Sequence, residues 1–350
     1  METVSMPFNR QVLLSRKMFL RRVKELPKPF NKVASRHLNE RFRHSANGVL
    51  LGEYTPWLFA DALGVKNNEC VLKFVQAWLN IYSYVVFIDD TIDRKNLPYR
   101  DLLSIAAGLL LQRGLSQLGK LVPDENRDSL MNAAGLFLKE TAAAAGREIS
   151  ERTAWSSYPK HLNVKRLGKK VAVLKLCVTY LELLRGEAGS TVKLVFVDSL
   201  GGAMQLLDDV SDWEEDCLTG SYTYPLATTF RKLASKRIIV SPSALSPDAL
   251  LAAMVITRAL EQTVAIANSA LSDVLKQLRV KPGSITETFL RGVIVKNNDF
   301  RMTLEETRQL LTSKDFNWSA TWFTELSKNL MARKQLNRLR RSFSIVAQSS

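Results

Sequence analysis

Two clusters of aspartates stand out in this chain of 350 residues, which carries a net charge of +15. The first lies in the stretch VVFIDDTIDR, and the second lies in QLLDDVSDWEED, over a hundred residues later. Neighbouring carboxylates repel one another, so we expect a cation to compensate them. Oxygen ligands without histidine or cysteine suit a hard cation such as Mg²⁺ or Mn²⁺. The clusters comprise Asp89, Asp90, Asp93, Asp208, Asp209, Asp212 and Asp216.

The spacing within each cluster predicts that its carboxylates share one face of a helix. Asp89 and Asp93 lie one helical turn apart. In the second cluster three aspartates follow one another at intervals of four, whereas Glu214 and Glu215 point to other faces. Each cluster closes a strongly apolar segment, at the negative end of a helix dipole, where carboxylates are unfavourable without a cation. We therefore predict metal ions between two opposed helix faces, bridged by a polyphosphate, rather than a solvated acidic surface.

Almost the whole chain, including the segments that carry these carboxylates, is predicted to be helical, because apolar residues recur at three- and four-residue spacings. A brief strand-like stretch occurs at 236–241. No composition shift marks a domain boundary, so we predict one all-α domain at 46–330 between a loose basic N-terminal segment, 1–45, and a basic C-terminal tail, 331–350. The expected helices are 68–92, 101–120, 127–150, 168–187, 190–216, 246–278 and 304–330.

Several function classes are excluded by composition. Three widely spaced cysteines form no disulfide framework, which predicts a reducing, cytoplasmic location. Three histidines without paired spacing make a zinc site unfavourable. No apolar run reaches the roughly 20 residues of a membrane span, and the basic N-terminal stretch lacks the apolar core of a secretory signal.

The basic excess gathers near both ends of the chain. Solvated helix faces, attraction to an anionic membrane or nucleic acid, and attraction of an anionic substrate all explain such a charge. No basic–aromatic stripe supports nucleic acid, so we predict none as a partner. Peripheral membrane contact through the basic termini stays open.

DDTID and QLLDDVSDWEED resemble the two aspartate-rich motifs of the class I isoprenoid synthase superfamily, which includes trans-prenyltransferases and class I terpene synthases. The second motif follows the prenyltransferase order from Gln205 to Asp216, and Gly220 comes after it. The resemblance covers roughly residues 48–225. It implies a single-domain all-α bundle with a central active-site cavity, three Mg²⁺ ions, and an allylic isoprenoid diphosphate whose C–O bond is ionised to a carbocation. A homodimer is a further expectation.

The resemblance also implies that both motifs bind the metal ions, from opposite walls of the cavity. Metal ions and fixed cations stabilise charge on the departing diphosphate, and aromatic rings stabilise the carbocation in a dry pocket. Catalysis is assigned to Asp89, Asp90, Asp93, Asp208 and Asp212, and metal binding to these five together with Asp209 and Asp216.

Basic and aromatic residues supply the expected contacts to the substrate. LGKKVAVLKL resembles the segment whose lysine reaches the allylic diphosphate, which matches Lys170, with Val171 in place of a threonine. Arg152 and Arg166 are both candidates for an arginine that senses the diphosphate. The substrate-binding residues expected from the resemblance are Tyr82, Tyr84, Arg94, Lys170 and Gln205.

The segment before the first motif departs from the pattern of chain-elongating enzymes. Those enzymes carry basic residues there to hold isopentenyl diphosphate, whereas this chain reads NGVLLGEYTPWLFADALG. With Pro56 matched to the proline of that motif, Gly52, Glu53 and Thr55 stand at the basic positions. An acid thus lies where the second diphosphate would bind.

The segment after the first motif departs as well, because only Arg94 and Lys95 replace a paired Arg-Arg-Gly. Both losses concern the second substrate, so we predict a one-substrate terpene synthase. Its substrate would be farnesyl or geranylgeranyl diphosphate, and its product a cyclic or linear terpene. Tyr84, five positions before Asp89, favours the shorter substrate.

Three alternatives remain. A chain-elongating prenyltransferase shares both motifs. EEDCLTGSYTYP, with its spacing from Gly220 to Pro225, also resembles the second motif of head-to-head squalene and phytoene synthases. A catalytically inactive partner subunit would keep the fold, but such subunits typically lose aspartates, and here all of them are present.

Overall fold

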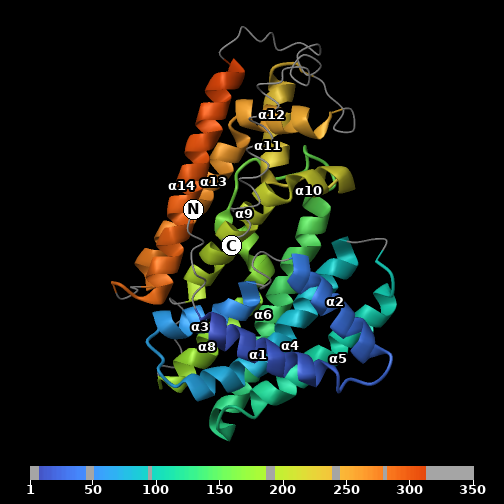
Figure 1. Cartoon of the computed structure of the whole chain (residues 1–350), viewed down its shortest axis with the longest axis vertical. Coiled ribbons are helices and arrows are strands. Elements are labelled where there is room, and N and C mark those ends of the chain that lie inside the picture. Colours follow the sequence, from blue (N-terminus) through green and yellow to red (C-terminus); the bar gives the residue numbers. More distant parts are fainter. Residues whose placement is uncertain are drawn as a thin grey trace. The chain divides into compact units, whose positions relative to one another are not determined.

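The computed structural model describes residues 8–44, 51–93, 97–186, 194–238, 245–278 and 282–312 (Figure 1). These residues form helices joined by turns, and none of them lies in a strand. The all-α prediction is confirmed. The chain divides into two compact units that interleave along the sequence, the first made of residues 1–142, 171–197 and 276–289, and the second of the remainder. No composition shift announces this division.

The first unit is built around α4 (Asn68–Asp93), whose side chains at Phe74, Trp78 and Ile81 are fully buried. α1, α3 and α5 pack on α4, and α8 packs on α3. α4 has the length and apolar composition of a membrane span, but its burial makes it a core helix of this unit. The other helices that lie wholly or mainly here are α1 (Asn9–Val23), α2 (Phe30–His44), α3 (Leu51–Ala62), α5 (Arg100–Gly119), α6 (Asp124–Glu151), η2 (Lys169–Leu174) and α8 (Lys175–Leu184).

The prediction of a loose N-terminal segment is wrong for residues 9–44, which form α1 and α2. Val12, Phe19 and Val23 are buried along one side of α1, and Leu38 is buried on α2. α1 packs on α4, while α2 packs on α5. The many cations of this segment dominate its composition, and they conceal the apolar stripe at helical spacing.

The second unit has a core of apolar side chains from α10 through α14, among them Phe230, Leu251 and Phe300. Arg258 adopts a left-handed conformation with φ 57° and divides the expected helix 246–278 into two. These two helices meet at a bend of 62°. The helices that lie mainly here are α7 (Val164–Gly168), α9 (Val195–Ser211), α10 (Trp213–Thr219), α11 (Tyr224–Ser235), α12 (Pro247–Ile256), α13 (Ala259–Leu278) and α14 (Ile285–Thr312).

The long apolar segments were predicted best. The expected helices 68–92, 101–120 and 127–150 correspond closely to α4, α5 and α6. The expected helix 168–187 is instead divided into α7, η2 and α8, with a non-helical Val171 between Lys170 and Ala172. The expected helix 304–330 overlaps α14, whose described part ends at Thr312, and the tail 331–350 lies outside the described residues.

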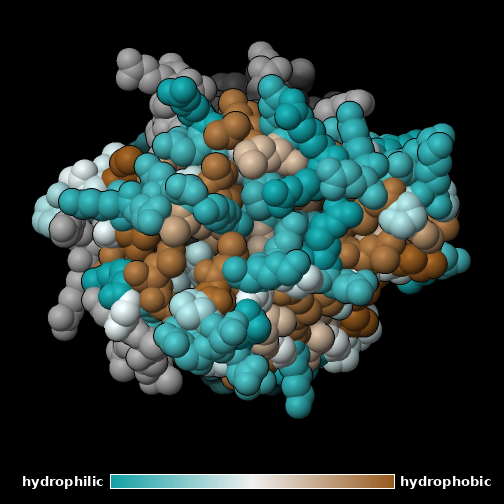
Figure 2. All heavy atoms as spheres, turned by 90° about the horizontal axis from the view of Figure 1, so that it is seen from below, coloured by the Kyte–Doolittle hydropathy of each residue, from teal (hydrophilic) through white to brown (hydrophobic). Residues whose placement is uncertain are grey.

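Large hydrophobic side chains that reach solvent are distributed over several helices, including Leu13 and Leu14 on α1 and Leu136 on α6. Figure 2 shows a face on which hydrophobic residues are interspersed among hydrophilic ones rather than gathered into one patch. Single exposed hydrophobic residues are normal on a protein surface.

Candidate active site

The second aspartate motif crosses the junction between α9 and α10, with Asp212 between the two helices. The prediction of one continuous helix is therefore wrong at this point. Nevertheless, the Asp212 N–H donates to the Asp208 carbonyl at 2.8 Å, and the Asp216 N–H donates to the Asp212 carbonyl at 2.9 Å. Because these bonds keep the helical i to i−4 pattern, the three aspartates still follow one another along one face.

Electrostatic repulsion is strong within this motif. The Asp208 side chain is exposed, but the protein atoms around it limit its hydration. This loss of hydration, together with repulsion from Asp212 and Asp209, raises the pKa of Asp208 to about 7. Burial likewise raises the pKa of Asp216 to about 8, against the opposing charge of Arg152. Carboxylates in this state gain from a nearby cation.

Asp209 faces the other way and is buried. Its Oδ1 accepts from Arg152 at 2.9 Å and from Gln205 Nε2 at 3.0 Å, and its Oδ2 has no partner. Gln205, which the resemblance assigned to substrate binding, is engaged here by a carboxylate of the same motif. Asp209 is thus held by protein groups, whereas Asp208 and Asp212 are exposed.

Arg152 connects α6 to this motif. Its side chain is only 14% exposed and lies 2.5 Å from Glu148 Oε1 as well as 2.9 Å from Asp209. Lys170 Nζ lies 3.0 Å from the other oxygen of Glu148. Lys170, Glu148, Arg152 and Asp209 therefore form one continuous chain of alternating charge. Arg152 is therefore already engaged by two carboxylates of the protein.

α7, which ends two residues before Lys170, packs closely against α9. A methyl group on Gly168 would overlap the Asp198 carbonyl, and one on Gly202 would overlap the Val164 carbonyl, so the two backbones touch. Only glycine permits so close an approach. As a consequence, the charge of Lys170 reaches Asp208 and lowers its pKa against the effect of burial.

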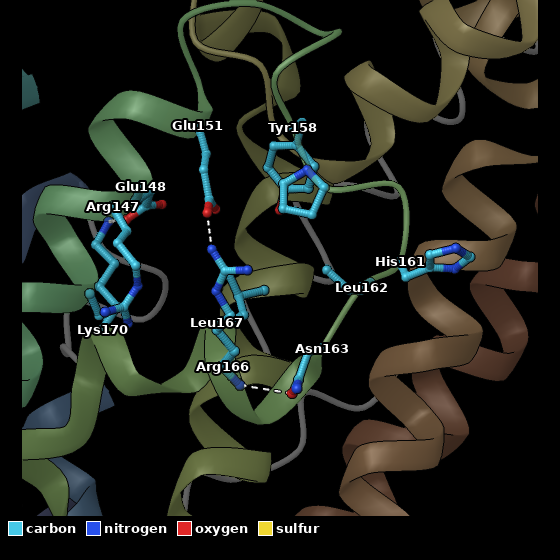
Figure 3. Close-up of a pocket in the computed structure, with 12 residues that line it drawn as sticks. Arg147, Glu148, Glu151, Tyr158, His161, Leu162, Asn163, Arg166, Leu167 and Lys170 are labelled. Atoms are coloured by element: carbon cyan, nitrogen blue, oxygen red, sulfur yellow. Dashed lines mark hydrogen bonds and ion pairs between the residues drawn. The ribbon is translucent and has the colours of Figure 1, made fainter.

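A pocket lies beside Lys170, between the end of α6, the loop after it and α7 (Figure 3). In Figure 3, Arg147, Glu148 and Lys170 gather on one side, while Arg166 points toward Glu151, with which it forms an ion pair. Arg166 is exposed, unlike Arg152. Of the two arginines proposed from the sequence, Arg166 is thus the one at a pocket open to solvent.

The first motif closes α4 in the first unit. Asp90 is buried, and its carboxylate lies 2.7 Å from His37 Nε2 and accepts from Arg41 Nε at 2.7 Å, with a second contact from the same guanidinium. Burial opposes ionisation of Asp90, but these hydrogen bonds lower its pKa. Asp89 is half-buried, the side chain of Asp93 is outside the described set, and so is Arg94.

Sequence reasoning gave no role to His37 and did not single out Arg41. Arg41 is one of many cations in the N-terminal segment, and no sequence pattern predicts its pairing with Asp90, 49 positions away. The ion pair exists because α2 packs on α5, which in turn packs on α4, the helix that carries the motif. A sequence pattern does not reveal this packing.

Glu53 also has a partner that the sequence pattern did not predict. Its carboxylate is buried and accepts two hydrogen bonds from Arg16, from Nε at 2.8 Å and from a terminal nitrogen at 2.6 Å. Nearby, Tyr82 lies against Gly52 and stacks on Trp78 with ring centroids 5.8 Å apart. Tyr82 therefore packs within the first unit, while Tyr84 is half-buried.

No three carboxylate, histidine or cysteine side chains converge closely enough to hold a metal ion within the described part of the chain. The chemistry of the second motif nevertheless fits a hard cation, since its donors are carboxylates with raised pKa values and Asp209 Oδ2 is unpartnered. The magnesium assignment stays a prediction.

No protein-family model and no curated protein matches the sequence. Solved structures are similar in fold. An octaprenyl pyrophosphate synthase from Helicobacter pylori matches with a TM-score of 0.61 at 15% identity, over 81% of this chain and 98% of that one. A geranylgeranyl pyrophosphate synthase from Lactobacillus brevis matches with a TM-score of 0.62 at 15% identity, over 81% and 94%.

A decaprenyl diphosphate synthase from Rhodobacter capsulatus gives a TM-score of 0.60 at 15% identity, over 83% of this chain and 96% of that one. Agreement over nearly the whole length of all three shows that the chain has the all-α fold of the isoprenoid synthases. The resemblance read from the two aspartate motifs is confirmed at the level of fold.

Proposed function

We propose that this chain is an enzyme that ionises an allylic isoprenoid diphosphate with the help of Mg²⁺. The observation that carries the proposal is the row formed by Asp208, Asp212 and Asp216, whose carboxylates repel one another on a fold shared with isoprenoid diphosphate synthases. The first aspartate motif, at the end of α4, lies in the other unit.

Each residue of the second motif has a separate part in this proposal. Asp208, Asp212 and Asp216 would hold Mg²⁺, which when bound supplies a Lewis acid for the leaving diphosphate. Lys170, whose ammonium group already acts on Asp208, donates to a diphosphate oxygen. Arg152 and Gln205 do not touch the substrate; they keep Asp209, and with it the end of α9, in place.

Chain elongation is the reaction that we propose first. The three solved structures described above are those of prenyl diphosphate synthases. They favour the alternative over the terpene synthase that the sequence motifs predicted. In an elongating enzyme the carbocation formed by ionisation alkylates a second substrate, isopentenyl diphosphate.

A one-substrate terpene synthase is the second candidate, and Glu53 favours it. The resemblance places a basic residue for isopentenyl diphosphate at this position, whereas the buried carboxylate of Glu53 is already neutralised by Arg16. A second diphosphate would meet a buried ion pair there instead of a free cation.

A product assay tests the proposal. The full chain is supplied with Mg²⁺ and geranyl, farnesyl or geranylgeranyl diphosphate, each with and without isopentenyl diphosphate, and products are identified by mass spectrometry. A longer diphosphate that requires isopentenyl diphosphate supports elongation, and a hydrocarbon or alcohol from one diphosphate alone supports the terpene synthase. Head-to-head condensation would also need no isopentenyl diphosphate, but its product would contain twice as many carbon atoms as the substrate. No product from any substrate would contradict enzymatic ionisation.

Matched variants link any activity to the motif. Asp212→Asn removes one charge from the proposed metal-binding face, and Glu215→Gln removes one from an exposed position on α10, the short helix that follows Asp212. We expect loss of at least about 100-fold in turnover for the first, in line with removal of one electrostatic catalytic group, and little change for the second. Equal activity of both variants would disprove the assignment.

A further inference from the structure

The outer face of α1 has an unusual composition. Its buried side consists of Val12, Phe19 and Val23, and the opposite side presents Leu13 and Leu14, which are 55% and 49% exposed. At the helical angle of about 100° per residue, the positions between these two leucines are occupied by cations. The exposed cations of this arc are Arg10, Lys17, Arg21 and Lys24.

The positive surface continues past the end of α1. Lys28 and Lys32 are exposed in the turn and the first part of α2. From Phe8 to His44 the chain has eleven arginines and lysines but only two glutamates. None of the exposed cations from Arg10 to Lys32 forms an ion pair with another described residue, whereas Arg16 and Arg41 on the inner faces are both paired.

The exposed cations and the two leucines beside them indicate which kind of partner binds this face of α1. Unpaired cations on one face repel one another, and an extended anionic surface relieves that repulsion. A small anion covers too little area to do so. Leu13 and Leu14 lie at the two edges of the cationic arc, where a polyanion such as RNA would leave them in water. In the interfacial region of a bilayer, acyl chains would cover both leucines while the lipid phosphates and carboxylates meet the cations.

We propose that the outer face of α1, together with Lys24, Lys28 and Lys32, docks on an anionic phospholipid bilayer. The proposal goes beyond the proposed catalytic function and does not depend on it. If both hold, docking places the enzyme at the surface in which long isoprenoid chains partition.

Binding of the full chain to vesicles tests the proposal. The probes are phosphatidylcholine vesicles with and without phosphatidylserine, read by co-sedimentation at two salt concentrations. We expect binding only to the vesicles that contain phosphatidylserine, and weaker binding at high salt because surface charge is screened. Equal binding to neutral vesicles, or none to either kind, would overturn the proposal.

Three double variants separate the contributions. Lys17→Gln/Arg21→Gln should weaken binding by about 25-fold, at roughly fivefold per charge near an anionic surface. Leu13→Ser/Leu14→Ser should weaken it by at least about tenfold through lost apolar contact. The control Lys66→Gln/Lys120→Gln removes the same charge at exposed positions of the same unit and should change binding little.

All six side chains are exposed, so the variants should fold like the parent, which circular dichroism and thermal melts verify. Loss of vesicle binding in the charge variant but not in the leucine variant would overturn lipid docking, and binding of polyuridylate measured in parallel would then identify a nucleic-acid surface. Equal losses in the control variant would also contradict the proposal, because net charge rather than this face would then be responsible.

Discussion

Replacing Arg152 with methionine tests the charge chain that supports the second aspartate motif. Methionine keeps much of the buried stem but removes the guanidinium that contacts Glu148 and Asp209. Glu148 keeps a cation, because Lys170 lies 3.0 Å from its other oxygen. Asp209 keeps only the hydrogen bond from Gln205 and is left as a buried, uncompensated charge.

The expected loss of stability follows from this difference between Glu148, which keeps a cation, and Asp209, which does not. Removing one partner of a buried ion pair costs about 3–5 kcal/mol, because the other charge stays buried without compensation. We therefore expect Arg152→Met to lower the free energy of unfolding by about 3 kcal/mol or more. Arg166→Met is the matched control, since that guanidinium is exposed and its pair with Glu151 should contribute at most about 1 kcal/mol.

A second substitution identifies which carboxylate carries the cost. In the Arg152→Met background, Asp209→Asn removes the uncompensated charge and should restore most of the lost stability, whereas Glu148→Gln should restore little. Urea denaturation of the single and double variants gives the coupling energies, for which about 1–3 kcal/mol is expected between Arg152 and Asp209. A loss below about 1 kcal/mol for Arg152→Met, or rescue by Glu148→Gln rather than by Asp209→Asn, would refute the reasoning.

Further predictions concern both units. Glu53→Gln should destabilise the chain by about 2 kcal/mol or more, because a largely buried arginine loses its counter-charge; a loss within experimental error in urea would contradict this. Gly168→Ala should destabilise strongly through a backbone clash, by about 3 kcal/mol or more, whereas Gly135→Ala, with open space around it on an exposed helix, should stabilise by about 0.5–1 kcal/mol. Limited hydration and repulsion from other carboxylates raise the pKa of Asp208 to about 7 and that of Asp216 to about 8, so the metal-free folded chain binds these protons more tightly than the unfolded chain. Stability without metal should therefore fall as the pH rises from about 4, near the ordinary pKa of aspartate, to about 8, and Mg²⁺ should raise the melting temperature most at the upper end of that range; a melting temperature that changes with neither pH nor Mg²⁺ would count against metal binding.

The sequence alone determined those features that depend on neighbours along the chain. The all-α fold and the extents of α4, α5 and α6 follow from apolar residues at helical spacing, which is a local property. The row of aspartates in the second motif was likewise foreseeable, because the i to i−4 hydrogen bonds persist across the break at Asp212. The superfamily resemblance rested on the same local spacing.

Tertiary structure decided which charges meet. Arg152 pairs with an aspartate 57 positions away, Arg41 with one 49 positions away, and Arg16 with a glutamate 37 positions away. Each partner was only one of many similar charges in the sequence, and no spacing rule selects among them. Packing selects them, because burial removes water from particular side chains and leaves those charges stable only beside an opposite charge.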